Sequence, residues 1–403
     1  MINDKVKSKV VGINIGTLET AIAIVDLRGN ILAQDSISTQ DYPNVNNFVE
    51  VLSERVITLA ESNGGYENIR SVGMCAPSAN YLTGCIENAA TMPWKGIVPV
   101  AAMLRDSIGL AVALGNDAHV TALGEWAYGV AHGMDNFIVV TLVGSGLGSC
   151  FFSNGQAHLG SEGFACEFGH TCIEDGGRLC TCGRRGCLEE YVSTRGIIQT
   201  AREMLESSSA PSSMRQLSEL TLDGIAACAD QGDELAKEVW KRTAELLGRA
   251  LANYASIINP EAIVLTGMLI QYIDKMWDVM EESFSQNVFG NIRDKAKIVL
   301  STIDDHERNV LGASALAWKV KEYSLFKWLT VSCQLLAVRL IFEAGATQEL
   351  THNAGGWYLF VADGQEVVDE LQQSVCLTIL RTILGYAGED DFRMGTQYGK
   401  LDV

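Results

Sequence analysis

The chain lacks an excess of positive charge. Lysine and arginine together number 30 against 49 aspartates and glutamates, which leaves a formal net charge of −19 at pH 7. Proteins that bind nucleic acid present a basic face to the phosphates, so we expect no nucleic-acid partner. A small-molecule site is not restricted in this way, because a local field can oppose the net charge of the whole protein.

Two kinds of hydrophobic segment are also missing. The sequence has no uninterrupted run of about 20 apolar residues, the length that a membrane-spanning helix needs, so we expect no membrane span. Residues 1–10 are charged and have no apolar centre, so we expect no secretory signal. Eleven cysteines without such a signal indicate a reduced, cytoplasmic compartment. Apolar residues make up 47% of the 403, which predicts a large buried core rather than disorder.

A cluster of possible metal ligands lies between residues 167 and 189. His170 is followed by Cys180, Cys182 and Cys187 in the pattern Cys-X-Cys-Gly-X-X-Gly-Cys. Three thiolates and one imidazole favour zinc over magnesium or calcium, and four protein ligands are typical of a structural zinc site. Buried free cysteines or a disulfide are the alternatives. The two turn glycines argue against the first, and the missing export signal argues against the second.

The same stretch resembles the signature of a known family. Glu-Phe-Gly-His at 167–170, followed by Cys-Thr-Cys-Gly-Arg-Arg-Gly-Cys-Leu-Glu at 180–189, is similar to the ROK family of bacterial sugar kinases and sugar-responsive repressors. The resemblance extends with gaps from about residue 10 to about residue 325 and leaves the last 78 residues uncovered. A repressor is not expected, because the first strand is predicted to start at Val10 and leaves no room for an N-terminal helix-turn-helix.

The resemblance implies an α/β fold with two lobes, the actin-like ATPase (ribonuclease H-like) fold, in which mixed sheets are flanked by helices. The small lobe would contain residues 1–117 and about 312–325, and the large lobe, with the zinc loop, residues 118–311. Residues 326–403 would form an extension of unknown role. Within it we predict helices at 326–344 and 367–384 and a strand at 357–361.

The family also assigns loops of this chain to ATP and its Mg²⁺. The glycine turn after the first strand would hold phosphates, a second glycine turn would clamp them from the other lobe, and a glycine after a later strand would approach the adenosine. The matching positions are Gly16, Thr17, Gly144, Ser145, Gly146 and Gly267.

Four residues of the nucleotide loops depart from the family. Asn14 stands where an Asp helps to place the metal, and it brings no charge to hold Mg²⁺. Thr17 and Leu18 occupy the usual Gly and Thr positions, and Met268 replaces a second adenosine glycine. An ordinary β-turn without a ligand is therefore the alternative for the first loop.

A carboxylate at a strand-to-helix junction is the candidate base. In Gly-Asn-Asp-Ala at 115–118, an acidic or amide side chain could cap the helix, or Asp117 could accept the proton of an attacking hydroxyl. The resemblance favours Asp117 as the catalytic base. It also implies contacts with sugar hydroxyls from Asn80, Asn116, Asp117, Glu167, His170 and Glu189.

These observations predict ATP-dependent phosphorylation of a hexose, with glucose at its 6-hydroxyl as the expected substrate. The partners would be the sugar and ATP, with a structural zinc ion, and the family suggests a homodimer. The alternative is a sugar-binding sensor or inactive kinase relative, because the departures at Asn14, Leu18 and Met268 fall on the nucleotide side. A third possibility is an interaction protein whose function lies in residues 326–403.

Overall fold

The structure is a computed structural model that describes residues 7–143 and 146–320, together with 348–353, 356–361, 366–371, 393–396 and 399–402. The chain divides into two compact units, Met1–Lys321 and Glu322–Val403. The first unit contains the predicted large lobe and all of the predicted small lobe except residues 322–325, and it ends five residues before the predicted start of the extension at residue 326. The division into lobes at residue 117 stays a prediction.

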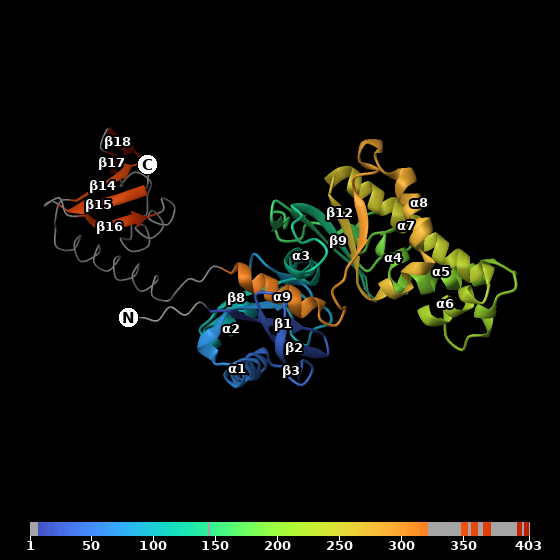
Figure 1. Ribbon diagram of the computed structural model, residues 1–403, viewed down its shortest axis with the longest axis horizontal. Helices are drawn as coiled ribbons and strands as arrows, with labels where there is room; N and C mark the ends of the chain where they lie inside the picture. The colour runs from blue at the N-terminus through green and yellow to red at the C-terminus, as the bar shows by residue number, and fades with distance from the viewer. Residues whose placement is uncertain are drawn as a thin grey trace. The chain divides into compact units, whose positions relative to one another are not determined.

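The first sheet is the mixed, five-stranded sheet of the N-terminal part (Figure 1). Its order is β3-β2-β1-β4-β8, with β1 antiparallel to β2 and parallel to β4. Because side chains alternate along a strand, Val11, Ile13 and Ile15 pack on one face against the two helices α1 and α2. The elements are β1 (Lys9–Ile15), β2 (Glu19–Asp26), β3 (Ile31–Ser38), β4 (Ile69–Cys75), β8 (Ala111–Gly115), α1 (Val45–Ser62) and α2 (Val100–Ile108).

A small sheet lies beside this lobe, formed by β5 (Ala79–Asn80), β6 (Cys85–Glu87) and β7 (Ile97–Val98). Trp94, in the loop before β7, is only 5% exposed and packs on Phe48 with the ring centroids 4.5 Å apart. Its indole N–H donates to the carbonyl of Tyr42 at 2.9 Å. Trp94 is therefore a core residue and not a platform for a sugar.

The second sheet has the order β11-β10-β9-β12-β13 and is also mixed. Ile138, Val140 and Leu265 point from its strands into a core shared with five helices. The strands are β9 (Asn136–Leu142), β10 (Leu147–Ser153), β11 (Gln156–Ala157), β12 (Ala262–Thr266) and β13 (Lys297–Leu300), and the helices are α4 (Glu189–Val192), α5 (Thr194–Ser207), α6 (Leu222–Asp230), α7 (Glu234–Ile258) and α8 (Trp277–Asn287). Mixed sheets flanked by helices confirm the predicted fold class.

Two helices, α3 (Asp117–Tyr128) and α9 (Arg308–Lys319), pack against each other and against both sheets (Figure 1). Glycines allow α9 to lie directly on the first sheet. A Cβ at Gly12 would lie 2.3 Å from the carbonyl oxygen of Val310, and one at Gly73 only 1.9 Å from that of Ala313. The position of α9 relative to β1 and β4 is therefore fixed by backbone packing.

The second unit contains a three-stranded antiparallel sheet in the order β14-β15-β16 and a separate two-stranded pair, β17-β18. The predicted strand at 357–361 is confirmed by β15. The predicted helix at 367–384 is wrong where it is described, because residues 367–371 belong to β16. The predicted helix at 326–344 lies outside the described residues. The strands are β14 (Gln348–Asn353), β15 (Gly356–Val361), β16 (Glu366–Leu371), β17 (Arg393–Thr396) and β18 (Gly399–Asp402).

Among the described residues, every helix is too short or too polar to cross a membrane.

The close approach of α9 to the first sheet gives a test of the fold. We expect Gly73→Ala to lower the free energy of unfolding by at least about 2 kcal/mol, because the new methyl group would overlap the carbonyl of Ala313. Urea denaturation measures this change. Gly290→Ala is the matched control, since no atom lies within 4 Å of its added Cβ, and it should change the unfolding free energy by less than about 0.5 kcal/mol. Equal unfolding midpoints for Gly73→Ala and the parent would contradict the described packing.

Candidate functional site

The junction between β8 and α3 presents the candidate base. Asn116 is the residue that caps α3, because its Oδ1 accepts a hydrogen bond from the backbone N–H of His119 at 2.7 Å. Asp117 is the first residue of the helix and is exposed, and within the described part of the chain its Oδ1 accepts only from the N–H of Ala118, at 2.8 Å. Because Asn116 serves as the cap, the carboxylate of Asp117 remains available to a ligand.

Glu167 lies close to this carboxylate. Its side chain keeps contact with solvent, yet the surrounding protein raises its pKa, the charges of Asp117 and Glu189 raise it further, and His170 opposes the rise. The predicted sugar-binding residues Asp117, Glu189 and His170 therefore all act electrostatically on Glu167, although Asp117 and Glu189 lie 72 positions apart in the sequence. A group of acceptors of this kind suits a ligand with several hydroxyl groups.

The turn that presents Glu167 is held by its neighbours. Cys166, just before it, has a φ of +69°, which is unusual for a residue other than glycine. The hydroxyl of Ser149 on β10 accepts from the N–H of Phe168 at 3.1 Å. On the other side, the ring of Phe168 stacks on Tyr254 of α7 with centroids 4.0 Å apart. Cys166 has a strained backbone, and Phe168 contacts both β10 and α7. Together they hold the turn in place and fix the direction of the Glu167 side chain.

Glu189, one of the predicted sugar-binding residues, contacts a glycine loop. Its side chain is buried, and its Oε2 accepts a hydrogen bond from the backbone N–H of Leu147 at 3.2 Å. A Cβ at Gly146 would lie only 2.4 Å from the same oxygen. Arg195 lies 3.6 Å from the other carboxylate oxygen. Glu189 thus supports the loop that was predicted to hold phosphate, of which Gly144 and Ser145 lie outside the described residues.

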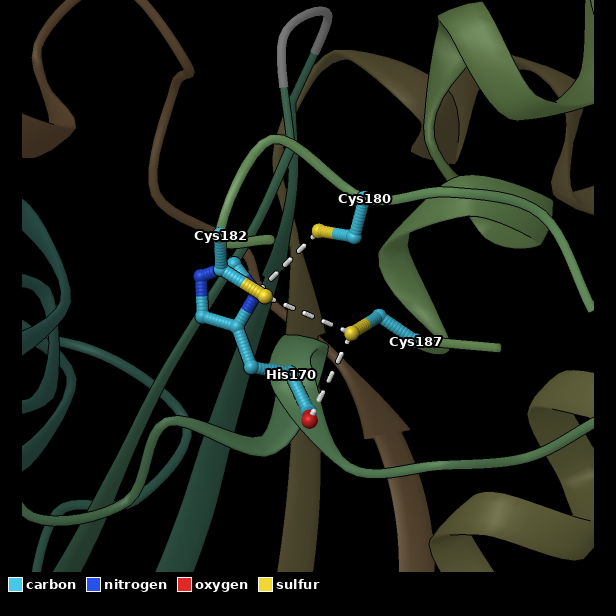
Figure 2. A group of neighbouring side chains, drawn as sticks. All are labelled: His170, Cys180, Cys182 and Cys187. Atoms are coloured by element: carbon cyan, nitrogen blue, oxygen red, sulfur yellow. Dashed lines mark hydrogen bonds between the residues drawn. The ribbon is translucent and has the colours of Figure 1, made fainter. Parts of the chain in front are cut away.

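The four predicted metal ligands come together (Figure 2). The ligand atoms of His170, Cys180, Cys182 and Cys187 all lie within 4.8 Å of one another. The Sγ of Cys180 is 3.6 Å from Nδ1 of His170, and the Sγ atoms of Cys182 and Cys187 are 3.6 Å apart. The backbone N–H of Arg184 is the main influence that holds the pKa of the Cys182 thiol below its ordinary value, which favours the thiolate that binds metals.

The loop that carries these thiols depends on two features. Gly186 has a φ of +78°, and a Cβ there would lie 1.8 Å from the carbonyl oxygen of Glu174, so only glycine fits. Arg178 ties the loop to the helices behind it. Its Nη1 donates to the carbonyls of Glu190 at 2.6 Å and Gly196 at 2.9 Å, and its guanidinium lies 4.6 Å from the ring centroid of Tyr191. Sequence reasoning missed Arg178.

A pocket of about 420 Å³ lies where the adenosine motif was predicted. Gly267, after β12, has a φ of +99°, and a Cβ there would lie 2.4 Å from the carbonyl oxygen of Leu142, so the chain turns closely past β9. Met268 is 41% exposed at the edge of the pocket. The pocket is lined by Thr266, Gly267, Met268, Ile270, Gln271, Ser301, Ile303, Asp305 and His306.

The first glycine loop lacks a charged metal ligand. Asn14, near the end of β1, accepts a long hydrogen bond of 3.4 Å from Asn309. Gly16 closes the turn by donating to the carbonyl of Glu19 at 2.9 Å, the carbonyl of Thr17 accepts from Gln40, and Leu18 is 73% exposed at the tip. Mg²⁺ prefers carboxylate and water oxygens, so the neutral side chain of Asn14 does not fit a directly held Mg²⁺.

Both polar atoms of the Asn80 amide form hydrogen bonds within the protein. It is 3% exposed, its Nδ2 donates to the carbonyl of Glu162 at 2.9 Å, and its Oδ1 accepts from the N–H of Leu82 at 3.0 Å. It joins two loops that are 82 positions apart. Any contact of Asn80 with a sugar would have to use the remaining hydrogen of its amino group or the second lone pair of its oxygen.

Comparison with known proteins shows which proteins this chain is similar to. A sequence model of the ROK family matches residues 10–320. A glucokinase from Halalkalibacterium halodurans is 29% identical over 321 residues, which cover 77% of this chain and 94% of that protein. The DNA-binding transcriptional dual regulator NagC from Escherichia coli is 25% identical over 313 residues, or 76% of this chain and 74% of the regulator.

A solved structure gives the same result for the fold. A ROK family glucokinase from Streptomyces griseus, in complex with glucose and AMPPNP, is 26% identical and has a TM-score of 0.62, with 77% of this chain and 100% of that chain covered. The predicted actin-like ATPase fold is thereby confirmed.

A buried histidine beside Asp117 makes the site sensitive to acid. His119 is 6% exposed, its Nδ1 has no hydrogen-bond partner among the described residues, and burial lowers its pKa from 6.5 to about 4. The unfolded chain therefore takes up a proton at this residue at a higher pH than the folded chain. Acidification from pH 7.5 to pH 5 should cost about 2 kcal/mol of stability through His119.

Urea denaturation at the two pH values, on the parent and on His119→Gln, checks this expectation. The variant should lose about 2 kcal/mol less stability on acidification than the parent, whatever its stability at pH 7.5. The exposed His158 provides the control His158→Gln, which should keep the pH dependence of the parent. Identical pH dependence in His119→Gln and the parent would contradict the assignment.

Proposed function

The chain belongs to the ROK family, and from this membership we propose that it is an ATP-dependent sugar kinase that phosphorylates a hexose. The observation that carries the proposal is the position of Asp117. It is an exposed carboxylate at a helix start, not used as the cap, with Glu167 close enough to feel its charge. Glucose is the proposed substrate and its 6-hydroxyl the acceptor, in line with the related glucokinases.

Asp117 would accept the proton of the sugar hydroxyl as the hydroxyl oxygen attacks the terminal phosphorus of ATP. The bond from that phosphorus to the bridging oxygen breaks, ADP leaves, and the sugar phosphate forms. Asn116, Asn80, Glu167, His170 and Glu189 would hold the remaining hydroxyls in place.

The nucleotide would lie in the pocket beside Gly267, with its phosphates between the two glycine loops. Gly146 belongs to one loop, next to Gly144 and Ser145, and Gly16 and Thr17 belong to the other. Backbone N–H groups in such turns bind anions. Because the neutral side chain of Asn14 does not fit a directly held Mg²⁺, no step of this mechanism is assigned to the ion.

A replacement of the base tests the proposal. Asp117→Asn keeps the size and polarity of the side chain but cannot take a proton, so we expect turnover to fall by about 10²-fold or more. Sugar affinity, measured by calorimetry, should stay within about threefold of the parent, because the contacts to the other hydroxyls remain. Asp106→Asn changes an exposed carboxylate on α2 and is the control. Full activity of Asp117→Asn would remove Asp117 as the base.

We further propose zinc as the ion held by His170, Cys180, Cys182 and Cys187. Bonds of 2.0–2.3 Å in a tetrahedron place ligand atoms about 3.3–3.8 Å apart, and two pairs of ligand atoms here are separated by 3.6 Å. Four protein ligands leave no position for a reacting water. The ion would order the loop between the turn of Glu167 and the start of α4 at Glu189.

Cys180→Ser should therefore lose zinc and stability together, because metal binding is coupled to folding of the loop. Metal analysis of the purified chain should give about one zinc per parent molecule and none in the variant, with a lower Tm. Cys172→Ser is the matched control, since Cys172 is an exposed thiol of the same loop region that is not among the four ligands. Full zinc content in Cys180→Ser would contradict the ligand assignment.

A sugar-binding sensor without turnover is the second candidate. The observations in its favour are the neutral Asn14, the exposed Leu18 at the tip of the first loop and Met268 at the edge of the nucleotide pocket. In that case the chain would bind a sugar and release no ADP, and Asn14→Asp would be the first variant to test for restored turnover.

A further inference from the structure

Arg308, the first residue of α9, carries a buried positive charge near the proposed base. Its side chain is 7% exposed, and its Nη1 forms an ion pair with Asp305. Burial lowers the pKa of Arg308, and the charge of Asp117 is the strongest influence that opposes this. Its Nε is buried without a hydrogen-bond partner among the described residues. A buried guanidinium normally uses its donors, so this group keeps at least one donor for something else.

The neighbours of Arg308 place it between the two halves of the site. Asp305 lines the pocket that we assign to the nucleotide, and Asp117 is the proposed base. The other charged or titratable groups that face the guanidinium are Glu125 of α3 and Cys75 at the end of β4. The carboxylate of Glu125 accepts a hydrogen bond from Ser301, which lines the same pocket. Arg308 is therefore connected to this pocket through its ion pair with Asp305 and interacts electrostatically with Asp117.

The next residue of α9 faces the altered first loop. Asn309 donates to Asn14, and its own Oδ1 is buried without a partner in the described part of the chain. The start of α9 cannot move away easily, because a glycine at position 12 brings β1 into contact with the carbonyl of Val310. The start of α9, whose first residue is Arg308, is therefore held beside the loop in which Asn14 brings no negative charge for a metal ion.

We propose that Arg308 is the resident cation of the phosphoryl-transfer site and that its guanidinium binds the terminal phosphate of the nucleotide. Arg308 would supply part of the positive charge that a directly held Mg²⁺ would otherwise bring. The first loop does not hold this ion directly, because Asn14 is neutral. Arginine suits this role because its guanidinium stays charged when buried and can offer two parallel N–H donors to phosphate oxygens. Such cations stabilise the charge of a transferring phosphoryl group. The inference rests on the proposed binding of a nucleotide.

The test is the affinity for ATP compared with that for ADP, measured by titration calorimetry on the full chain with glucose present. A contact with the terminal phosphate is available to ATP alone. Arg308→Gln should weaken ATP binding by about tenfold or more, as expected for the loss of a charge-assisted hydrogen bond, and should leave ADP binding within about twofold. Arg105→Gln, on the exposed end of α2, is the matched control and should change neither affinity.

Arg308→Lys keeps the charge and loses the planar pair of donors. It should weaken ATP binding by less than Arg308→Gln and leave ADP binding unchanged. If Arg308→Gln does not fold, as judged by circular dichroism, Arg308→Lys decides: a selective loss of ATP affinity supports the proposal, and an unchanged ATP affinity overturns it.

Equal losses of ATP and ADP affinity, no loss of either, or a parent chain that binds no nucleotide would each overturn the role of Arg308. These results are separate from the kinase proposal. If Arg308→Gln loses ATP affinity selectively but the parent releases no ADP with any sugar, the role of Arg308 is supported and the kinase proposal is contradicted. If the parent phosphorylates a sugar and Arg308→Gln binds ATP as the parent does, the kinase proposal is supported and the role of Arg308 is contradicted.

Discussion

The contact of α9 with the bare backbone of β1 and β4 is the constraint on which both halves of the site depend. Gly12 and Gly73 have no side chains to hold the helix away, so the start of α9 lies beside the first loop. The same helix packs on α3, whose first residue is Asp117. One closely packed helix thereby sets the distance between the proposed base, the first loop and the buried guanidinium of Arg308.

The charges of the site give a physical reason for this rigid arrangement. Asp117, Glu167 and Glu189 gather in a protein that already carries a net charge of −19. Carboxylates can accept hydrogen bonds from sugar hydroxyls and can accept a proton, but they repel the phosphates of a nucleotide. Phosphoryl transfer therefore needs fixed positive charge at one point. In the proposed site, Arg308 would supply this charge on the phosphate side of the acidic group, and the loop with the predicted metal ligands would fix the residues on the sugar side.

The parts of the structure that depend on local patterns could be predicted from the sequence. The strand predicted at 357–361 is observed within β15 (Gly356–Val361), because a short run of aromatic and apolar residues favours a strand. The four predicted metal ligands come together because two glycines close a short loop. Arg178 and Arg308 could not be predicted, since their roles depend on partners brought together only by the fold. The prediction of a helix is wrong at β16, because a pattern of a few apolar residues is compatible with both the helical and the strand periodicity. The adjacent Val367 and Val368 favour the strand.

The most direct test of the account is a coupled assay of ADP release with ATP and a panel of hexoses and N-acetylhexosamines. The account predicts sugar-dependent ADP release, with glucose among the substrates, from the parent chain with its metal site filled. Binding of a sugar, seen as a rise in Tm, with no ADP released for any member of the panel would contradict the kinase. That result would identify the chain as a sugar-binding relative whose first phosphate loop no longer supports turnover.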